Sequence, residues 1–112
     1  MIEFETTSSE GGPTVVAPIG RLDMVAAPQL RTIVTETVAG GVNRLVVDLG
    51  ETQFLDSSGL GALIAGLKTT RQAGGDLRIA RPNEQVQLVL ELTQMNTVLR
   101  PYPTVEAALA AG

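Results

Sequence analysis

The sequence contains no cysteine and no histidine. Without cysteine, disulfide bonds, thiolate catalysis and cysteine-ligated zinc are excluded. Without histidine, the commonest metal ligand is missing, and so is the general base of a serine hydrolase. These function classes therefore drop out before any motif is considered.

Aromatic residues are also scarce, at 3% of the 112 residues, and there is no tryptophan. Eight basic side chains stand against twelve acidic ones, which gives a formal net charge of −4. Proteins that bind nucleic acids favour basic surfaces and aromatic rings on which bases stack. We therefore expect no nucleic-acid partner.

No apolar run approaches the roughly 20 residues that span a bilayer. The first residues, Met1 to Glu5, lack the basic and apolar parts of a secretory signal. We therefore expect a cytoplasmic protein with no direct membrane insertion. With 44% hydrophobic residues, the chain can bury an aliphatic core, and we expect residues 1–112 to form a single domain.

Hydrophobic periodicity predicts an α/β fold. Strands are expected over residues 2–7, 14–19, 45–49 and 76–80, with an edge strand at 98–99 that the following prolines stop. Helices are expected over residues 27–39, from 57 to the glycines at 74–75, from 83 onward and over 105–111. The first two strands form a hairpin through a turn at residues 8–13, and the later strand–helix alternation implies parallel strands. The predicted fold is thus a mixed sheet with an N-terminal hairpin and a parallel centre, backed by about four helices.

The most informative segment is residues 45–61, which reads as a buried strand, a short connection and a helix that begins with Ser57 and Ser58. A helix start presents unpaired N–H groups and the positive end of the macrodipole, so it favours negative charge. A serine there can cap the helix, or it can accept a phosphoryl group that the same amides stabilise. Spacing alone leaves both interpretations open.

Two carboxylates stand in comparable places, since Asp23 and Asp56 each follow an apolar stretch and precede a helix. We expect both at the edge of the sheet outside the strand carboxyl ends, where open α/β sheets carry their functional sites. Both can equally be helix-capping residues. As a metal site the pair is poor, because magnesium requires more oxygen ligands than two carboxylates supply.

Catalytic motifs are missing around these residues. The serines lack the Gly-x-Ser-x-Gly pattern of a hydrolase elbow, and Lys68, the only lysine, lies about three helical turns away. Gly11-Gly12-Pro13 lacks the Gly-Lys-Ser/Thr ending of a nucleotide-binding loop. We therefore expect a protein that is not an enzyme and has no cofactor of its own. If a serine is phosphorylated, another protein supplies ATP, magnesium and the base.

The sequence resembles the STAS domain family, and within it the bacterial anti-sigma factor antagonists. The resemblance rests on Asp48-Leu49 with residues 54–61, on residues 20–30, and on Gly74-Gly75 followed by Leu77. It implies a small sheet backed by helices and makes Ser57 the phosphoacceptor. The other residues that we expect at the phosphorylation and partner-binding surface are Asp23, Met24, Asp56, Ser58, Gly59 and Leu60.

The resemblance also implies a mechanism of partner switching. The unphosphorylated protein would bind an anti-sigma factor that is also a GHKL-type serine kinase, and the sigma factor would be freed. Phosphorylation of Ser57 would add negative charge beside Asp23 and Asp56 and release the partner until a serine phosphatase acts. Met24 and Leu60 are candidate apolar anchors for the partner, with core packing as the alternative for both.

A different function stays open, because STAS domains also serve as nonenzymatic subunits of transport systems, including the partner of a lipid-transport ATPase. There the same surface binds a transporter subunit and the serine need not be modified. The sequence departs from the family at Arg21, a position that is often acidic, and at residues 92–96, which replace a glycine-containing turn. The basic residue Arg21 at this position is expected to alter which partner is bound.

Overall fold

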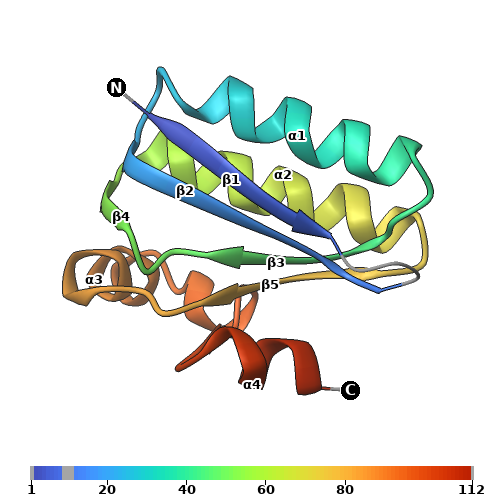
Figure 1. Ribbon diagram of the computed structural model, residues 1–112. Helices are drawn as coiled ribbons and strands as arrows, with labels where there is room; N and C mark the ends of the chain where they lie inside the picture. Colours follow the sequence, from blue (N-terminus) through green and yellow to red (C-terminus); the bar gives the residue numbers. More distant parts are fainter. Residues whose placement is uncertain (1, 9–11, 112) are drawn as a thin grey trace.

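The computed structural model describes residues 2–8 and 12–111. In this part of the chain a six-stranded sheet is packed between helices (Figure 1). The strands are β1 (Glu3–Ser8), β2 (Thr14–Leu22), β3 (Arg44–Asp48), β4 (Thr52–Leu55), β5 (Asp76–Ala80) and β6 (Pro101–Tyr102). The helices are α1 (Ala27–Ala39), α2 (Ser57–Gln72), α3 (Glu84–Leu92), the short 3-10 helix η1 (Met95–Thr97) and α4 (Val105–Ala110).

The strands run in the order β1-β2-β3-β5-β6, and β4 pairs with β2 beside this path. β1 is antiparallel to β2, whereas all other pairs are parallel. The predicted N-terminal hairpin and parallel centre are therefore confirmed. The expected turn at residues 8–13 lies partly outside the described residues.

One strand was not predicted, because β4 reads in the sequence only as a connection between β3 and α2. In the structure Thr52–Leu55 pairs with the last residues of β2, so that β2 extends to Leu22 rather than ending at residue 19. Gly20 allows the extension: its φ of +114° favours glycine, and the register shifts between Gly20 and Arg21. The polar start of β4 concealed it, yet Thr52 is buried and its hydroxyl donates to the carbonyl of Pro18 at 2.8 Å.

The predicted edge strand is displaced as well. Residues 98–99 do not form a strand; Leu99 follows η1, is fully buried, and donates its amide to the carbonyl of Met95 at 2.7 Å. The edge strand is β6, and Pro101 is part of it rather than its stop. Proline is tolerated there because an edge strand needs no donor on its outer side.

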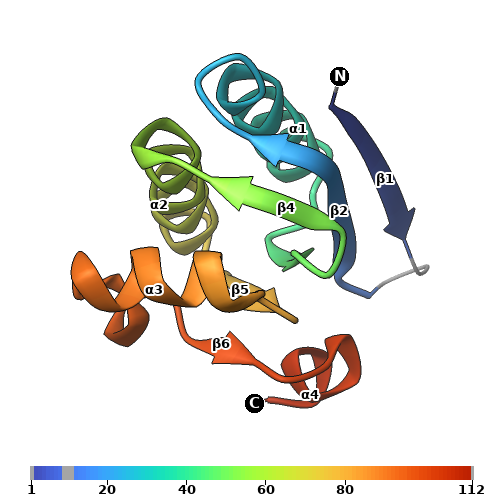
Figure 2. The same ribbon diagram turned by 90° about the vertical axis from the view of Figure 1, so that its left-hand side faces the viewer.

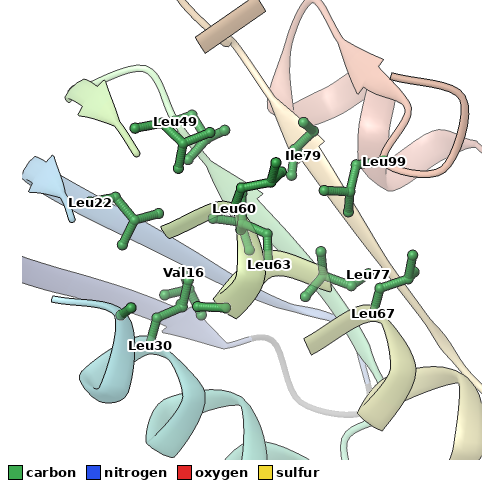
Figure 3. Packing of buried hydrophobic residues seen from close by; sticks show 14 of the residues in the cluster. Val16, Leu22, Leu30, Leu49, Leu60, Leu63, Leu67, Leu77, Ile79 and Leu99 are labelled. Atoms are coloured by element: carbon green, nitrogen blue, oxygen red, sulfur yellow. The ribbon is translucent and has the colours of Figure 1, made fainter. Parts of the chain in front are cut away.

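Helices α1 and α2 cover one face of the sheet (Figures 1 and 2), and the main hydrophobic core lies between them and the strands. Alternate residues of β3 point to opposite faces, so Leu45 and Val47 belong to this core while Val46 packs with Ala108 of α4 on the other face. Figure 3 shows how leucines of α2 interleave with those of the strands. Within the described residues no helix is long and apolar enough to cross a bilayer.

Candidate functional site

The site lies where β2 and β4 end side by side. Leu22 and Leu55 are register partners, and the chain turns from each of them toward the start of a helix, α1 or α2 (Figure 2). Asp23 and Asp56 come directly after these partners. The two carboxylates therefore lie at the same edge of the sheet, as the sequence pattern predicts.

Asp56 joins the two turns. One carboxylate oxygen, Oδ1, accepts the amide of Gly59 at 2.8 Å and caps α2. The other, Oδ2, accepts the amide of Met24 at 3.2 Å. The capping interpretation is thus right for Asp56, and the same side chain ties the turn after β2 to the start of α2.

Because Asp56 caps α2, the serines are not needed for that task. Ser57 is the first residue of the helix, and its side chain is exposed. Among the described residues its hydroxyl has no hydrogen-bond partner. Ser58 is half-buried. The structure therefore leaves Ser57 with an accessible hydroxyl beside the unpaired amides of the helix start.

Asp23 stabilises the turn that leads into α1. Its Oδ1 accepts the amides of Val25 at 3.0 Å and Ala26 at 3.2 Å, and its Oδ2 lies 4.0 Å from Nε of Arg21. The N-cap of α1 is Ala26, which has no side-chain capping bond. Asp23 lies three residues before this N-cap, yet it bonds as a capping residue does, since its own carbonyl also accepts the amide of Ala27 at 2.8 Å. Asp23 thus caps the turn that leads into α1 and fixes the shape of that turn.

This turn holds two apolar side chains in solvent. Met24 is 66% exposed and Val25 is 71% exposed. Single exposed apolar residues are common, but two adjacent ones on a turn whose backbone Asp23 and Asp56 hold form a small apolar tip. Met24 is thus accessible to a partner, as proposed from the sequence.

Leu60 does not share this role. It is only 6% exposed and packs in the main core, where Figure 3 shows it beside Leu63. Its expected place at the partner-binding surface is wrong. The reason is visible in the sequence, because Leu60 is the first member of the apolar stripe that continues with Leu63 and Leu67 and turns toward the sheet.

Gly59 is buried and allows α2 to approach β2 closely. A Cβ atom at this position would lie 2.1 Å from the carbonyl oxygen of Leu22 and 2.8 Å from a methyl carbon of Leu55. No other residue fits without moving backbone. Gly59 therefore sets the position of the helix start, and with it that of Ser57.

Sequence reasoning missed the contribution of α3. The Gln85 side chain accepts the amide of Leu55 and donates to its carbonyl, both at 2.9 Å, as a neighbouring strand would. Asn83 caps α3 and donates to the carbonyl of Thr52 at 3.1 Å. These amides satisfy the open side of β4. Because β4 itself was not predicted, no sequence pattern indicated that Asn83 and Gln85 would bind its backbone.

A further pair of side chains lies on the outer surface of β2 and β4. The guanidinium of Arg21 stacks on the ring of Phe54, with Cζ 4.1 Å from the ring centre. Arg21 thereby places one positive charge near the carboxylate of Asp23. Arg21, a residue at which the sequence departs from the family, therefore places a cation at the border of the site.

At the carboxyl ends of β3 and β5, Arg81 forms a bidentate ion pair with Asp48, at 2.9 and 2.8 Å. Burial alone would raise the pKa of Asp48, but hydrogen bonds from Arg81 and from the Gly50 amide, with the charge of Arg81, lower it overall. The same pairing raises the pKa of Arg81. In the described part of the chain, no three acidic side chains converge as metal ligands would.

Comparison with known proteins agrees with this geometry. Residues 3–108 match the family model of the STAS domain. The chain belongs to the STAS domain family. A relative from Thermotoga maritima named "Putative anti-sigma factor antagonist" is 32% identical over 69 residues, which is 62% of this chain and 61% of that protein. The match thus spans less than two thirds of that relative's length.

Two solved structures of this STAS domain's relatives cover nearly the whole chain. The Thermotoga maritima protein superposes with a TM-score of 0.86 at 25% identity, covering 94% of this chain and 90% of that one. An anti-sigma factor antagonist from Mycobacterium paratuberculosis gives a TM-score of 0.85 at 29% identity, with 97% and 92% covered. The predicted STAS-like fold is therefore confirmed.

Proposed function

We propose that this STAS domain is an anti-sigma factor antagonist whose binding is switched by phosphorylation of Ser57. The observation that carries the proposal is the exposed, unpartnered Ser57 hydroxyl at the start of a helix that Asp56 already caps. The names of the relatives supply the class of partner. The binding surface consists of the apolar tip, Met24 and Val25, together with the first turn of α2.

In the proposed cycle the chain is a substrate and not an enzyme. The partner is an anti-sigma factor that is also a GHKL-type serine kinase, and it brings ATP, magnesium and a base. The Ser57 oxygen attacks the γ-phosphorus, the bond to the ADP oxygen breaks, and the serine proton passes to the base of the kinase. A serine phosphatase hydrolyses the phosphoserine and restores the hydroxyl. The STAS domain contributes the hydroxyl at the start of α2, with no cofactor of its own.

Phosphorylation acts through charge. The phosphate adds about −1.5 to −2 charges at neutral pH, next to a turn that already holds Asp23 and Asp56. The amides at the start of α2 stabilise this charge in the free protein. Against a partner the same charge is desolvated without a matching cation, which costs several kcal/mol. A loss of about 3 kcal/mol weakens binding more than a hundredfold.

The test is to incubate the purified chain with its kinase partner and ATP and to locate the phosphate by mass spectrometry. We expect phosphate on Ser57, none on the Ser57→Ala variant, and full incorporation into Ser58→Ala, the matched control one residue along α2. Ser57→Ala is expected to bind the partner constitutively and Ser57→Asp weakly. Phosphate on Ser58 or on a threonine, or equal binding by the two Ser57 variants, contradicts the proposal.

The alternative, a nonenzymatic subunit of a transport system, uses the same surface without modification. The exposed hydroxyl at position 57 and the antagonist names of the relatives favour the switch. A chain that binds a transporter subunit and is never phosphorylated would support the alternative. Neighbouring genes give a quick indication, since a kinase and a phosphatase accompany a switch and a permease accompanies transport.

A further inference from the structure

The edge of the sheet opposite to Ser57 carries a hollow with an unusual charge. It has a volume of about 500 Å³ and lies over the start of β5, bounded by the end of α2 and the segment from Thr97 to Tyr102. Three of the eight basic residues of the chain, Arg71, Arg78 and Arg100, line it. Among the described residues that line it, Asp76 is the only acidic one. The whole chain is negative, so this is a local reversal of charge.

The hollow exists because β6 is short. β6 pairs only with Ile79 and Ala80, so the preceding residues of β5, from Asp76 to Arg78, have no strand neighbour on that side. The chain reaches β6 through η1, which stands away from the start of β5. The open length of β5 forms the floor.

The floor of this hollow is a fixed ion-pair scaffold. Nε of Arg78 lies 3.5 Å from Asp76, its Nη1 donates to the carbonyl of Ala108 at 3.1 Å, and it also donates to the carbonyl of Ala111. The side chain of Arg78 is 16% exposed. Arg78 thereby compensates both the carboxylate of Asp76 and the carbonyls at the end of α4.

The walls of the hollow carry two further guanidiniums, those of Arg71 and Arg100. Nε of Arg71 lies 3.4 Å from the same Asp76 carboxylate, but 58% of the Arg71 side chain is exposed. Arg100 is exposed and has no hydrogen-bond or ion-pair partner among the described residues. Arg71 is thus only partly compensated, and Arg100 is uncompensated among the described residues. Val98 and Tyr102 also line the hollow.

We propose that this hollow binds a soluble phosphate monoester. A phosphate dianion suits the exposed guanidiniums of Arg71 and Arg100, and the planar fork of arginine matches phosphate oxygens. The volume leaves room for an organic group against Val98 and Tyr102. The site is independent of the proposed switch, because Ser57 and Arg71 lie at opposite ends of α2, about 20 Å apart along its axis.

The test is an NMR titration of the ¹⁵N-labelled chain with phenyl phosphate, and separately with inorganic phosphate, at constant ionic strength. We expect saturable shifts of the amides of residues 76–78 and 97–102. Arg100→Gln is expected to weaken phenyl phosphate binding about tenfold or more, because it removes a charged hydrogen bond. The matched control is Arg31→Gln, an exposed arginine on α1 with the same change of charge.

Arg100 has no partner among the described residues, so its replacement leaves the fold intact, which the dispersion of the same spectra verifies. Shifts that do not saturate, or equal affinity in the Arg100 and Arg31 variants, overturn the proposal. Sedimentation with phosphatidate-containing vesicles forms a second arm. Binding to these vesicles without binding of soluble phenyl phosphate also overturns the proposal, because the bound phosphate would then belong to a lipid headgroup. Phosphorylation of Ser57 is unchanged by Arg100→Gln in every case.

Discussion

At the scale of single residues, the geometry around Ser57 depends on contacts that allow almost no substitution. Gly59 lies against the backbone of β2, and Asp56 binds amides on both sides of the site. Gly59 and Asp56 can therefore affect partner binding without contacting the partner themselves. Both fix the position of the helix start that carries Ser57.

Gly59→Ala is expected to destabilise the fold, although alanine normally favours a helix. The new methyl would stand 2.1 Å from the Leu22 carbonyl oxygen, so α2 or β2 must shift, at a cost of about 1–3 kcal/mol. The control is Gly61→Ala, where the nearest atom is Nη2 of Arg31 at 3.5 Å and a gain of about 0.5–1 kcal/mol is expected. Urea unfolding measures both changes. An equal effect of the two substitutions would contradict the close contact at Gly59.

The ion pair of Asp48 and Arg81 predicts a pH dependence of stability. The folded pKa of Asp48 lies below its ordinary value of 3.8, so the stabilisation is complete above that value and is lost as the pH falls through the lowered pKa. Arg81 has a φ of +54°, a conformation that asparagine tolerates. Arg81→Asn is therefore expected to lower the free energy of unfolding at pH 7 by about 1–2 kcal/mol, the pair being partly exposed.

Urea unfolding of both proteins as a function of pH measures this effect. The difference between wild type and Arg81→Asn is expected to shrink as the pH falls below 3.8. A difference that stays constant in acid would mean that the Asp48 carboxylate is not the group that Arg81 stabilises.

At the scale of elements, the fold was predictable wherever a pattern is local. The stripe of α2, the hairpin and the β-branched run of β3 are each contained in a few consecutive residues. β4 was not predictable, because it exists through pairing with a distant extension of β2 and through the side-chain amides of α3. Pairing of this kind leaves no periodic signal in four residues that begin with Thr52 and Gln53.

The same reasoning explains what could be predicted of the site. Asp23, Asp56 and Ser57 follow strand ends, so their common edge follows from parallel topology. The burial of Leu60 was also present in the helical spacing, whereas the exposure of Met24 depends on a turn whose shape only the hydrogen bonds of Asp23 and Asp56 reveal.

Gln85→Ala tests the contribution of α3 to β4. It leaves the amide and carbonyl of Leu55 without partners, so a loss of about 1–3 kcal/mol and faster hydrogen exchange at the Leu55 amide are expected. Gln87→Ala is the control on the same helix, since its exposed side chain makes one hydrogen bond, to the Pro82 carbonyl. Equal stability and exchange in the two variants would show that β4 does not depend on Gln85.

At the scale of the whole molecule, the parallel strands separate two regions of different charge. The carboxyl ends of β2 and β4 lead to Asp23, Asp56 and Ser57, the proposed phosphoacceptor, whereas the start of β5 faces the arginine-lined hollow. A phosphate on Ser57 extends into solvent from the helix start and requires no rearrangement of the core. The proposed switch would therefore act through the charge of one surface, and the fold is expected to stay the same in both states.

The most direct test of this account is the affinity of the chain for the proposed anti-sigma factor partner, with serine or with phosphoserine incorporated at position 57. Isothermal titration calorimetry gives both dissociation constants, and phosphoserine at position 58 is the control. We predict that phosphoserine at position 57 weakens binding more than about a hundredfold, the equivalent of about 3 kcal/mol, while the fold is unchanged. Equal dissociation constants for serine and phosphoserine at position 57 would contradict the central claim.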